Sequence, residues 1–288
     1  MTSVRWSMAF MVLFTALWAV VERLSSALSR PYSPFQVVFT RYLVHLAFML
    51  AIWGWRDPGS LWRTSRPGYQ IARSALMLLM PAAFVASLRL GVPESTVFAV
   101  VALAPLLILA LAAFLLSEHA RLPVWAAAVA AAFGGAASVE PRGLPAPWLV
   151  IFPLGMAGAF SLYVVMTRSL RTEPTRANLF YTAAGVAVVL AFDMPRVWIT
   201  PTPADAGLMT SIGLLGLAGL WALDRMASLA PVSATAPLTG LYAVFAAGGR
   251  ALVGAHLPGP LGATALVVVV LAGVLVWAHS SDSLQQAS

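Results

Sequence analysis

The sequence contains no cysteine, which excludes disulfide bonds and thiolate chemistry. It also contains no lysine, because all 17 basic residues are arginines. Charged residues make up only 9% of the chain, whereas ordinary soluble domains carry about 25%. So few charges cannot cover a surface that faces water. Since 60% of the residues are hydrophobic, we expect the chain to lie in a lipid bilayer.

Motifs typical of enzymes are missing as well. The four histidines fall on separate segments without the HExxH spacing, and there is no Gly-x-Ser-x-Gly elbow or phosphate-binding loop. Catalysis needs a convergent nucleophile and base, or a metal cluster. The pattern therefore argues against an enzyme, and we expect no metal and no cofactor.

The basic residues do not indicate a nucleic-acid partner. The arginines are scattered over loops and accompanied by Trp55, Trp62 and Tyr69, a composition typical of the membrane interface. The expected partners are therefore the lipid bilayer and a small-molecule substrate.

Ten apolar stretches reach or approach the roughly 20 residues that a helix needs to cross the hydrocarbon core. The predicted fold class is an all-α integral membrane protein with ten transmembrane helices, of which the fifth and seventh are the shortest. The stretches lie at about 6–28, 34–54, 70–90, 95–116, 123–139, 148–170, 176–193, 207–229, 231–254 and 259–278.

The arginines also predict an orientation, because cytoplasmic loops carry an excess of positive charge. With both termini inside, ten arginines fall on the cytoplasmic side and six outside, leaving Arg41 within the membrane. The sequence thus favours a membrane protein with both termini cytoplasmic. The cytoplasmic set is Arg5, Arg56, Arg63, Arg66, Arg73, Arg121, Arg168, Arg171, Arg176 and Arg225.

The two halves of the sequence resemble each other. LWAVVERL, ending at Leu24, matches LYVVMTRSL, ending at Leu170, so that Trp18 aligns with Tyr163. Matched prolines follow in the same order, including Pro93 and Pro231. An odd number of crossings in each half makes the second half upside down relative to the first, which is the architecture of many secondary transporters. We expect repeats at 1–140 (helices 1–5) and 145–280 (helices 6–10), with a short tail at 281–288.

Four segments carry a resemblance to a known family: SPFQVVFTRYL, VFAVVALAPLLILALAAFLLSEH, SLYVVMTRSL and APVSATAPLTGLYAVFAAGG. With these the chain resembles the drug/metabolite transporter superfamily, specifically its ten-helix members built from two EamA-type repeats, amino-acid exporters among them. The resemblance implies a basket of ten helices around a central cavity that exports or exchanges small metabolites such as amino acids, and it implies a bacterial inner membrane as the location. One departure is that Glu118 closes the fourth helix while His256 stands where the ninth commonly has an acid.

Ionisable residues within the bilayer are costly and are functional candidates by default. Arg41 lies roughly 10 Å and Glu22 about 9 Å from the external ends of neighbouring helices, counting 1.5 Å per residue, which predicts an ion pair. The pair is either a structural clamp or a site in which Arg41 binds a substrate carboxylate through its planar fork. His45, four positions after Arg41, is a candidate proton relay or a histidine hydrogen-bonded within the core.

Aromatic residues near the membrane midplane indicate where the ligand binds, since inverted-repeat transporters place their site there. Trp18 and Tyr163 are the leading candidates because they are repeat equivalents. Such rings also serve as packing residues in bundle cores. The full set of candidate substrate-binding residues is Trp18, Tyr163, Phe84, Phe98, Trp221 and Tyr242.

Prolines and a glycine near helix centres are candidate hinges for alternating access. Pro81, Pro105 and Pro237 interrupt the third, fourth and ninth helices, and Gly219 softens the eighth. Static kinks that only shape a cavity are the alternative.

The sequence as a whole predicts a secondary transporter that works by alternating access through a central cavity. Amino acids are the favoured cargo, with hydrophobic or aromatic side chains preferred because of the aromatic lining. Drug or other metabolite efflux is the nearest alternative. A membrane enzyme and a non-transporting sensor or scaffold are the alternatives from other classes.

Overall fold

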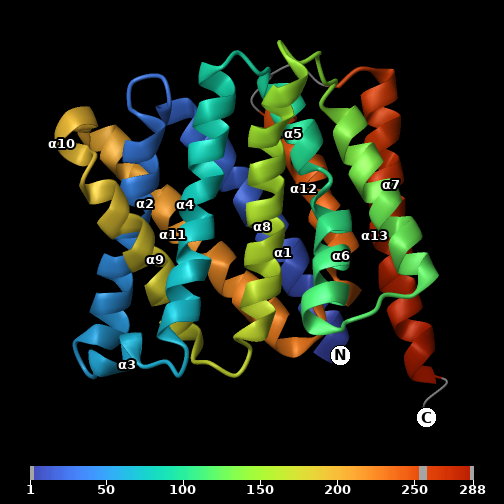
Figure 1. The fold of residues 1–288 in the computed structure, drawn as a ribbon, viewed down its shortest axis with the longest axis horizontal. Helices are drawn as coiled ribbons and strands as arrows, with labels where there is room; N and C mark the ends of the chain where they lie inside the picture. The colour runs from blue at the N-terminus through green and yellow to red at the C-terminus, as the bar shows by residue number, and fades with distance from the viewer. Residues whose placement is uncertain (1–2, 253–257, 286–288) are drawn as a thin grey trace.

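The computed structural model of the chain describes residues 3–252 and 258–285. These residues form a bundle of helices that run roughly parallel or antiparallel to one another (Figure 1). In order they are α1 (Ser3–Leu28), α2 (Pro34–Met49) with η1 (Leu50–Gly54), α3 (Gly59–Trp62), α4 (Pro67–Arg89), α5 (Glu94–Val101), α6 (Ala104–Leu116), α7 (Leu122–Ser138), η2 (Pro147–Val150) with α8 (Ile151–Ser169), α9 (Thr175–Ala191), α10 (Met194–Val197), α11 (Pro203–Leu229), η3 (Val232–Ala234), η4 (Ala236–Gly240), α12 (Leu241–Leu252) and α13 (Pro260–Gln285).

Seven of these segments are long and apolar enough to cross a membrane within the described residues. Two shorter apolar helices, Leu122–Ser138 and Thr175–Ala191, and the broken ninth segment bring the total to ten. The all-α, ten-helix membrane fold predicted from the sequence is therefore confirmed. The last two positions of the predicted ninth stretch, and His256, lie outside the described residues.

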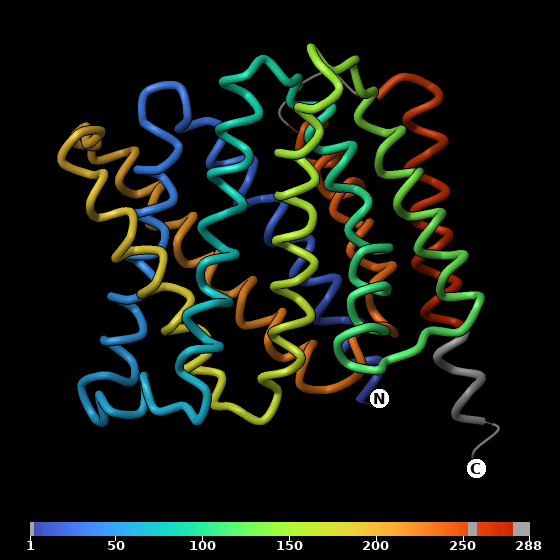
Figure 2. Tube along the Cα trace, viewed as in Figure 1, coloured from blue at the N-terminus to red at the C-terminus, as the bar shows by residue number. Residues whose placement is uncertain are grey.

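The two halves run in opposite directions. α1 starts at the face where α13 ends, whereas α8, which the predicted repeat pairs with α1, starts at the opposite face (Figures 1 and 2). We call the face at which α1 begins the terminal face, and the opposite one, at which α2 and α8 begin, the far face. Helices of one half pack mainly on helices of the other, α1 on α11, α4 on α8 and α7 on α13. Helices from both halves therefore border the space between them.

Two of the crossings are interrupted at their centres. The fourth crossing breaks at Ala102 and Leu103, between α5 and α6, directly before Pro105. The ninth passes through two short 3-10 turns, the second of which contains Pro237. By contrast, α4 continues as a helix through Pro81. Broken helices are tolerated within a membrane where they line a cavity, and both breaks do so here.

Glycines on α11 allow α2 to approach closely. A Cβ added at Gly213 would lie 2.5 Å from Cβ of Val44, and one added at Gly216 would lie 3.2 Å from Cδ of Arg41. Since Val44 Cβ is fixed to its backbone, the clash at Gly213 cannot be relieved by a rotamer change. This contact holds α2, with Arg41, against α11.

A Gly213→Ala substitution should therefore destabilise the protein by about 1–3 kcal/mol, the usual cost of overpacking. Gly207→Ala on the same helix is the matched control, because nothing lies within 4 Å of its added Cβ. Thermal unfolding in detergent should show a lower midpoint for Gly213→Ala and an unchanged or higher midpoint for Gly207→Ala. Equal midpoints in the two variants would disprove the close approach.

Candidate functional site

A cavity lies between the halves and opens toward the far face. Its outer part has a volume of about 460 Å³ and reaches Ser29 and Pro34, where α1 ends and α2 begins. A deeper part of about 140 Å³ extends to the helix breaks at Ala104 and Thr239. The outer part falls within the range of roughly 300–1,000 Å³ that is typical of small-molecule sites.

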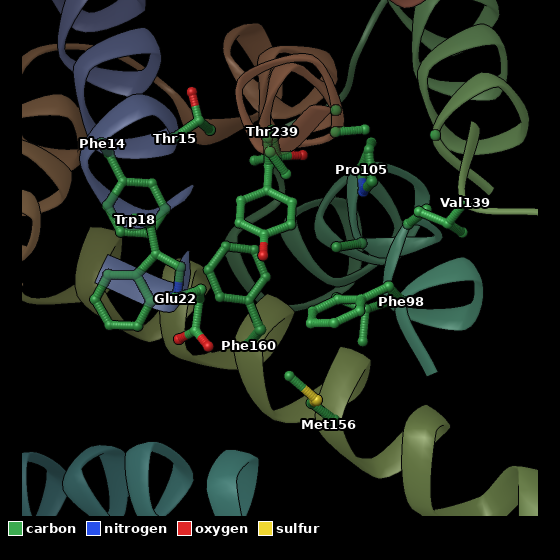
Figure 3. Close-up of a pocket in the computed structure, with 18 of the residues that line it drawn as sticks. Phe14, Thr15, Trp18, Glu22, Phe98, Pro105, Val139, Met156, Phe160 and Thr239 are labelled. Atoms are coloured by element: carbon green, nitrogen blue, oxygen red, sulfur yellow. The ribbon is translucent and has the colours of Figure 1, made fainter. Parts of the chain in front are cut away.

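Aromatic rings form the walls where the two parts of the cavity meet. Phe14 and Trp18 come from α1, and Figure 3 shows them across the cavity from Phe98 on α5. Phe14 stacks on Phe160 of α8 with ring centroids 6.1 Å apart, and Phe98 lies 6.3 Å from the ring of Tyr242. Such walls suit a ligand with a planar or apolar group.

A charged pair stands beside these rings. Nη1 of Arg41 lies 3.9 Å from Oε1 of Glu22, and the guanidinium lies over the indole of Trp18, 5.2 Å from its centroid. The side chain of Arg41 is only 8% exposed, whereas that of Glu22 is 35% exposed. The predicted ion pair is thus present, and both of its members line the cavity.

The structure brings four of the six predicted aromatic residues to the cavity, namely Trp18, Phe84, Phe98 and Tyr242. It does not bring the other two there. Tyr163 is buried, with its hydroxyl 3.2 Å from that of Thr182, and Trp221 is 40% exposed with its edge against Phe10. Trp221 therefore faces outward from the bundle.

The candidate relay His45 also lies away from the cavity lining. It is buried, and its ring packs edge-on against Tyr42 with centroids 4.9 Å apart. Of the candidate hinges, Pro81 and Pro105 line the cavity. Gly219 instead lies where α11 crosses α1, next to Leu17.

Sequence reasoning missed several residues of the lining. Phe160 and Met156 of α8, together with Glu94 and Arg250, border the cavity. Phe14 was detectable, because residues 14, 18 and 22 follow one another at intervals of four and share a helix face. Phe160, Met156 and Arg250 could not be found without knowing how α8 and α12 rotate about their axes, and the same holds for Glu94 on α5.

The terminal face is closed below this cavity by an ion pair whose side chains are 12% and 14% exposed. Nε of Arg168, at the end of α8, donates to Oε1 of Glu118 over 2.9 Å. Arg168 also donates to the carbonyl of Ala227 at 2.7 Å, and Glu118 accepts from the backbone N–H of Ser233 at 3.4 Å. We call Arg168, Glu118, Ala227 and Ser233 the terminal latch. It joins the end of the fourth crossing to three elements of the second half.

A second contact joins the halves on the same face. Glu173, in the loop after α8, accepts hydrogen bonds from Ser65 and Thr64, in the loop before α4. These bonds, the one from the Ser65 hydroxyl foremost, lower the pKa of the Glu173 carboxyl from its usual value. The carboxylate therefore stays ionised and holds the two loops together.

Comparison with known proteins supports a transporter. Residues 5–139 match the model of the EamA-like transporter family. Relatives named S-adenosylmethionine uptake transporters occur in Rickettsia conorii (26% identical over 204 residues, covering 70% of this chain and 69% of the relative) and Rickettsia felis (27% over 214 residues, covering 74% and 72%). A further one occurs in Rickettsia prowazekii (24% over 230 residues, covering 80% and 78%).

One solved crystal structure has the same fold. It matches with a TM-score of 0.75 over 95% of this chain and 96% of the other, at 22% identity. The fold and these matches together define a multi-pass membrane protein. Residues 5–139 are similar to EamA-like transporters, so the likeness of this chain is to transporters of small molecules and not to enzymes.

Proposed function

We propose that this carrier moves a zwitterionic metabolite bearing a planar ring across a bacterial inner membrane, by alternating access. S-adenosylmethionine is the first candidate, and an aromatic amino acid is the second. The terminal face is taken as cytoplasmic, because the excess of arginines lies on that side of the predicted topology.

The observation that carries this proposal is the pairing of Arg41 and Glu22 beside an aromatic wall. A zwitterion with an α-amino acid head could exchange this ion pair for two of its own, its carboxylate meeting Arg41 and its ammonium meeting Glu22. Each charge would then remain compensated, which matters because isolated charges are costly inside a membrane protein. A clamp of two charges 3.9 Å apart, one of them 35% exposed to the cavity, is open to such an exchange.

The chemistry of S-adenosylmethionine fits the remaining lining. Its adenine can stack on rings such as Trp18 and Phe98, and its sulfonium is a cation that aromatic faces and carboxylates attract. Glu94 supplies a second carboxylate at the mouth of the cavity. The relatives named for uptake of this solute give the proposal its second support.

Aromatic amino-acid export is the second candidate because the same head group and rings would suit tryptophan or phenylalanine. A tryptophan side chain has no cation, so it would leave Glu94 without a role. Efflux of drugs without an amino-acid head would use the rings alone and would not require the charged pair.

Transport by purified protein in proteoliposomes tests the proposal. Counterflow of radiolabelled S-adenosylmethionine should be saturable, and unlabelled S-adenosylmethionine should compete better than tryptophan or phenylalanine. The order reverses if the carrier is an amino-acid exporter. Indifference to all three solutes, in protein that is folded and monodisperse, would remove the zwitterion proposal altogether.

A further inference from the structure

A buried cluster near the terminal face repeats the arrangement of the cavity. The guanidinium of Arg73, on α4, lies over the ring of Tyr163, on α8, 5.0 Å from its centroid. Its Nη1 donates to Oγ1 of Thr167 over 3.0 Å. In the cavity, Arg41 lies over Trp18 and beside Glu22 in the same way.

The correspondence follows the repeat. Tyr163 is the equivalent of Trp18, and Thr167 is the equivalent of Glu22 at the same offset along α8. The two arginines come from helices that do not correspond in the repeat, α2 and α4. The two clusters are therefore alike in their spatial arrangement, and the arginines themselves do not align in sequence. Both arginines belong to the first half, and each lies against the same two positions of the first helix of one half, Arg41 against α1 and Arg73 against α8.

The depths of the two arginines match from opposite faces. Arg41 lies roughly 10 Å inward from Pro34, where α2 begins at the far face, at 1.5 Å per residue. Arg73 lies about 9 Å inward from Pro67, where α4 begins at the terminal face (Figure 1). The clusters therefore stand at equivalent positions on the two sides of the bilayer.

Neutral oxygens surround Arg73. Its Nη2 donates to the carbonyl of Asn178 at 2.6 Å, to Oε1 of Gln70 at 3.0 Å and to Oγ1 of Thr182 at 3.2 Å. Its Nε, in the part of the chain that the structure describes, is buried without a hydrogen-bond partner. A guanidinium that is only 1% exposed is normally paired with an acid, because burying an uncompensated charge is expensive.

The acid nearest along this network is reached only through another side chain. Asn178 donates from Nδ2 to Oδ1 of Asp224 over 2.7 Å, and Thr175 donates to Oδ2 of the same carboxylate over 2.6 Å. Asp224 is thus occupied by these donors and leaves Arg73 without a direct anion. Among the described residues Nε of Arg73 has no hydrogen-bond partner and its other donors hold only neutral oxygens, which a carboxylate that enters from the terminal face can displace.

We propose that the Arg73 cluster is the terminal-face counterpart of the Arg41 site and binds the carboxylate of the same solute when the carrier opens to that face. This inference rests on the zwitterion proposed above. In the present conformation the far-face cavity is open and the terminal latch is closed, so the cluster is sealed. When the carrier opens to the other face, Tyr163 and Arg73 form the wall and the anion site, as Trp18 and Arg41 do at the far face.

The test measures how strongly each face recognises a carboxylate. Two competitors that differ by the carboxylate are compared. They are tryptophan and tryptamine, or S-adenosylmethionine and its decarboxylated form, and the pair used is the one that inhibits the wild-type carrier. Each is added to right-side-out or to inside-out vesicles, and the ratio of the two inhibition constants is taken for each face. The ratio of inhibition constants does not depend on the fraction of carrier that faces each side, because both competitors bind the same conformation.

Wild-type carrier should prefer the carboxylated competitor from both faces. Arg73→Gln should reduce that preference by about tenfold or more from the terminal face and leave it unchanged from the far face, since a hydrogen bond to a charged group is lost. Arg41→Gln should do the reverse. Arg171→Gln, which removes an exposed arginine just after α8 and outside the cluster, is the matched control and should keep the preference at both faces.

Several results would overturn the inference. An unchanged ratio in Arg73→Gln, or an equal loss at both faces, would make Arg73 a structural residue. If Arg73→Gln does not fold, Arg73→Lys replaces it, and the same one-sided loss is required because lysine lacks the planar fork. A wild-type carrier that ignores the carboxylate from both faces would instead remove the zwitterion proposal on which this one rests.

Discussion

Replacing Arg168 with glutamine should open the terminal face and slow transport by at least about tenfold. The substitution leaves Glu118 with its 3.4 Å contact to Ser233 and no countercharge, although its side chain is only 14% exposed. Breaking a buried pair by removing one partner typically costs about 3–5 kcal/mol. Because the latch exists only while the terminal face is closed, that cost falls on the far-open state and shifts the equilibrium away from it.

Labelling at a buried position measures this shift. Thr235 is fully buried behind the latch, and the chain has no cysteine of its own, so Thr235→Cys gives a single reporter. A water-soluble maleimide should modify it about tenfold faster when Arg168→Gln is also present. The charge exchange Arg168→Glu with Glu118→Arg should restore part of the protection. Labelling that is equally slow with and without Arg168 would show that the pair does not close this face.

Replacing Glu22 with glutamine should change which charges the carrier selects. The variant loses the carboxylate for the solute ammonium, so affinity for the zwitterion should fall by about tenfold or more. At the same time Arg41 loses its countercharge, and anions without an ammonium group should bind better than before. Competition by tryptophan and by indolepropionate, which lacks the ammonium, measures both effects in one assay.

The control for this prediction is Arg89→Gln, since Arg89 lies at the end of α4 outside the cavity lining. It should leave both competitors unchanged. A Glu22→Gln carrier that still prefers the zwitterion as strongly as the wild type would mean that the pair is a structural clamp only.

Helix positions could be predicted from the sequence because apolar runs and prolines mark them directly. The stretch expected at 34–54 is α2 with η1, and the break in the fourth crossing falls next to Pro105. The short helices α3 and α10 were missed, since they lie in polar connections with no apolar period. The rotation of each helix about its axis was not predictable either. Trp221 was therefore expected at the cavity because it lies near the centre of α11, whereas it faces outward.

Among the charged groups, too, some contacts could be predicted from the sequence and others could not. The Arg41 and Glu22 pair was predictable because equal depth on neighbouring helices follows from counting residues. Arg73 was counted with the cytoplasmic arginines because its helix was expected to begin at residue 70, only three residues before it, whereas α4 begins at Pro67. Those three residues move Arg73 nearly one turn deeper. Its contact with Tyr163 depends on the packing of α4 on α8, which no local pattern records.

The most direct test of the central claim is protection of a cysteine inside the cavity. Ala246 borders both parts of the cavity, and Gly68, with nothing within 4 Å of an added Cβ, serves as an exposed control. Saturating S-adenosylmethionine should slow the maleimide labelling of Ala246→Cys by about tenfold and leave that of Gly68→Cys unchanged. If the solute is transported by Ala246→Cys protein and yet leaves its labelling rate unchanged, then the solute does not occupy the space between the two halves.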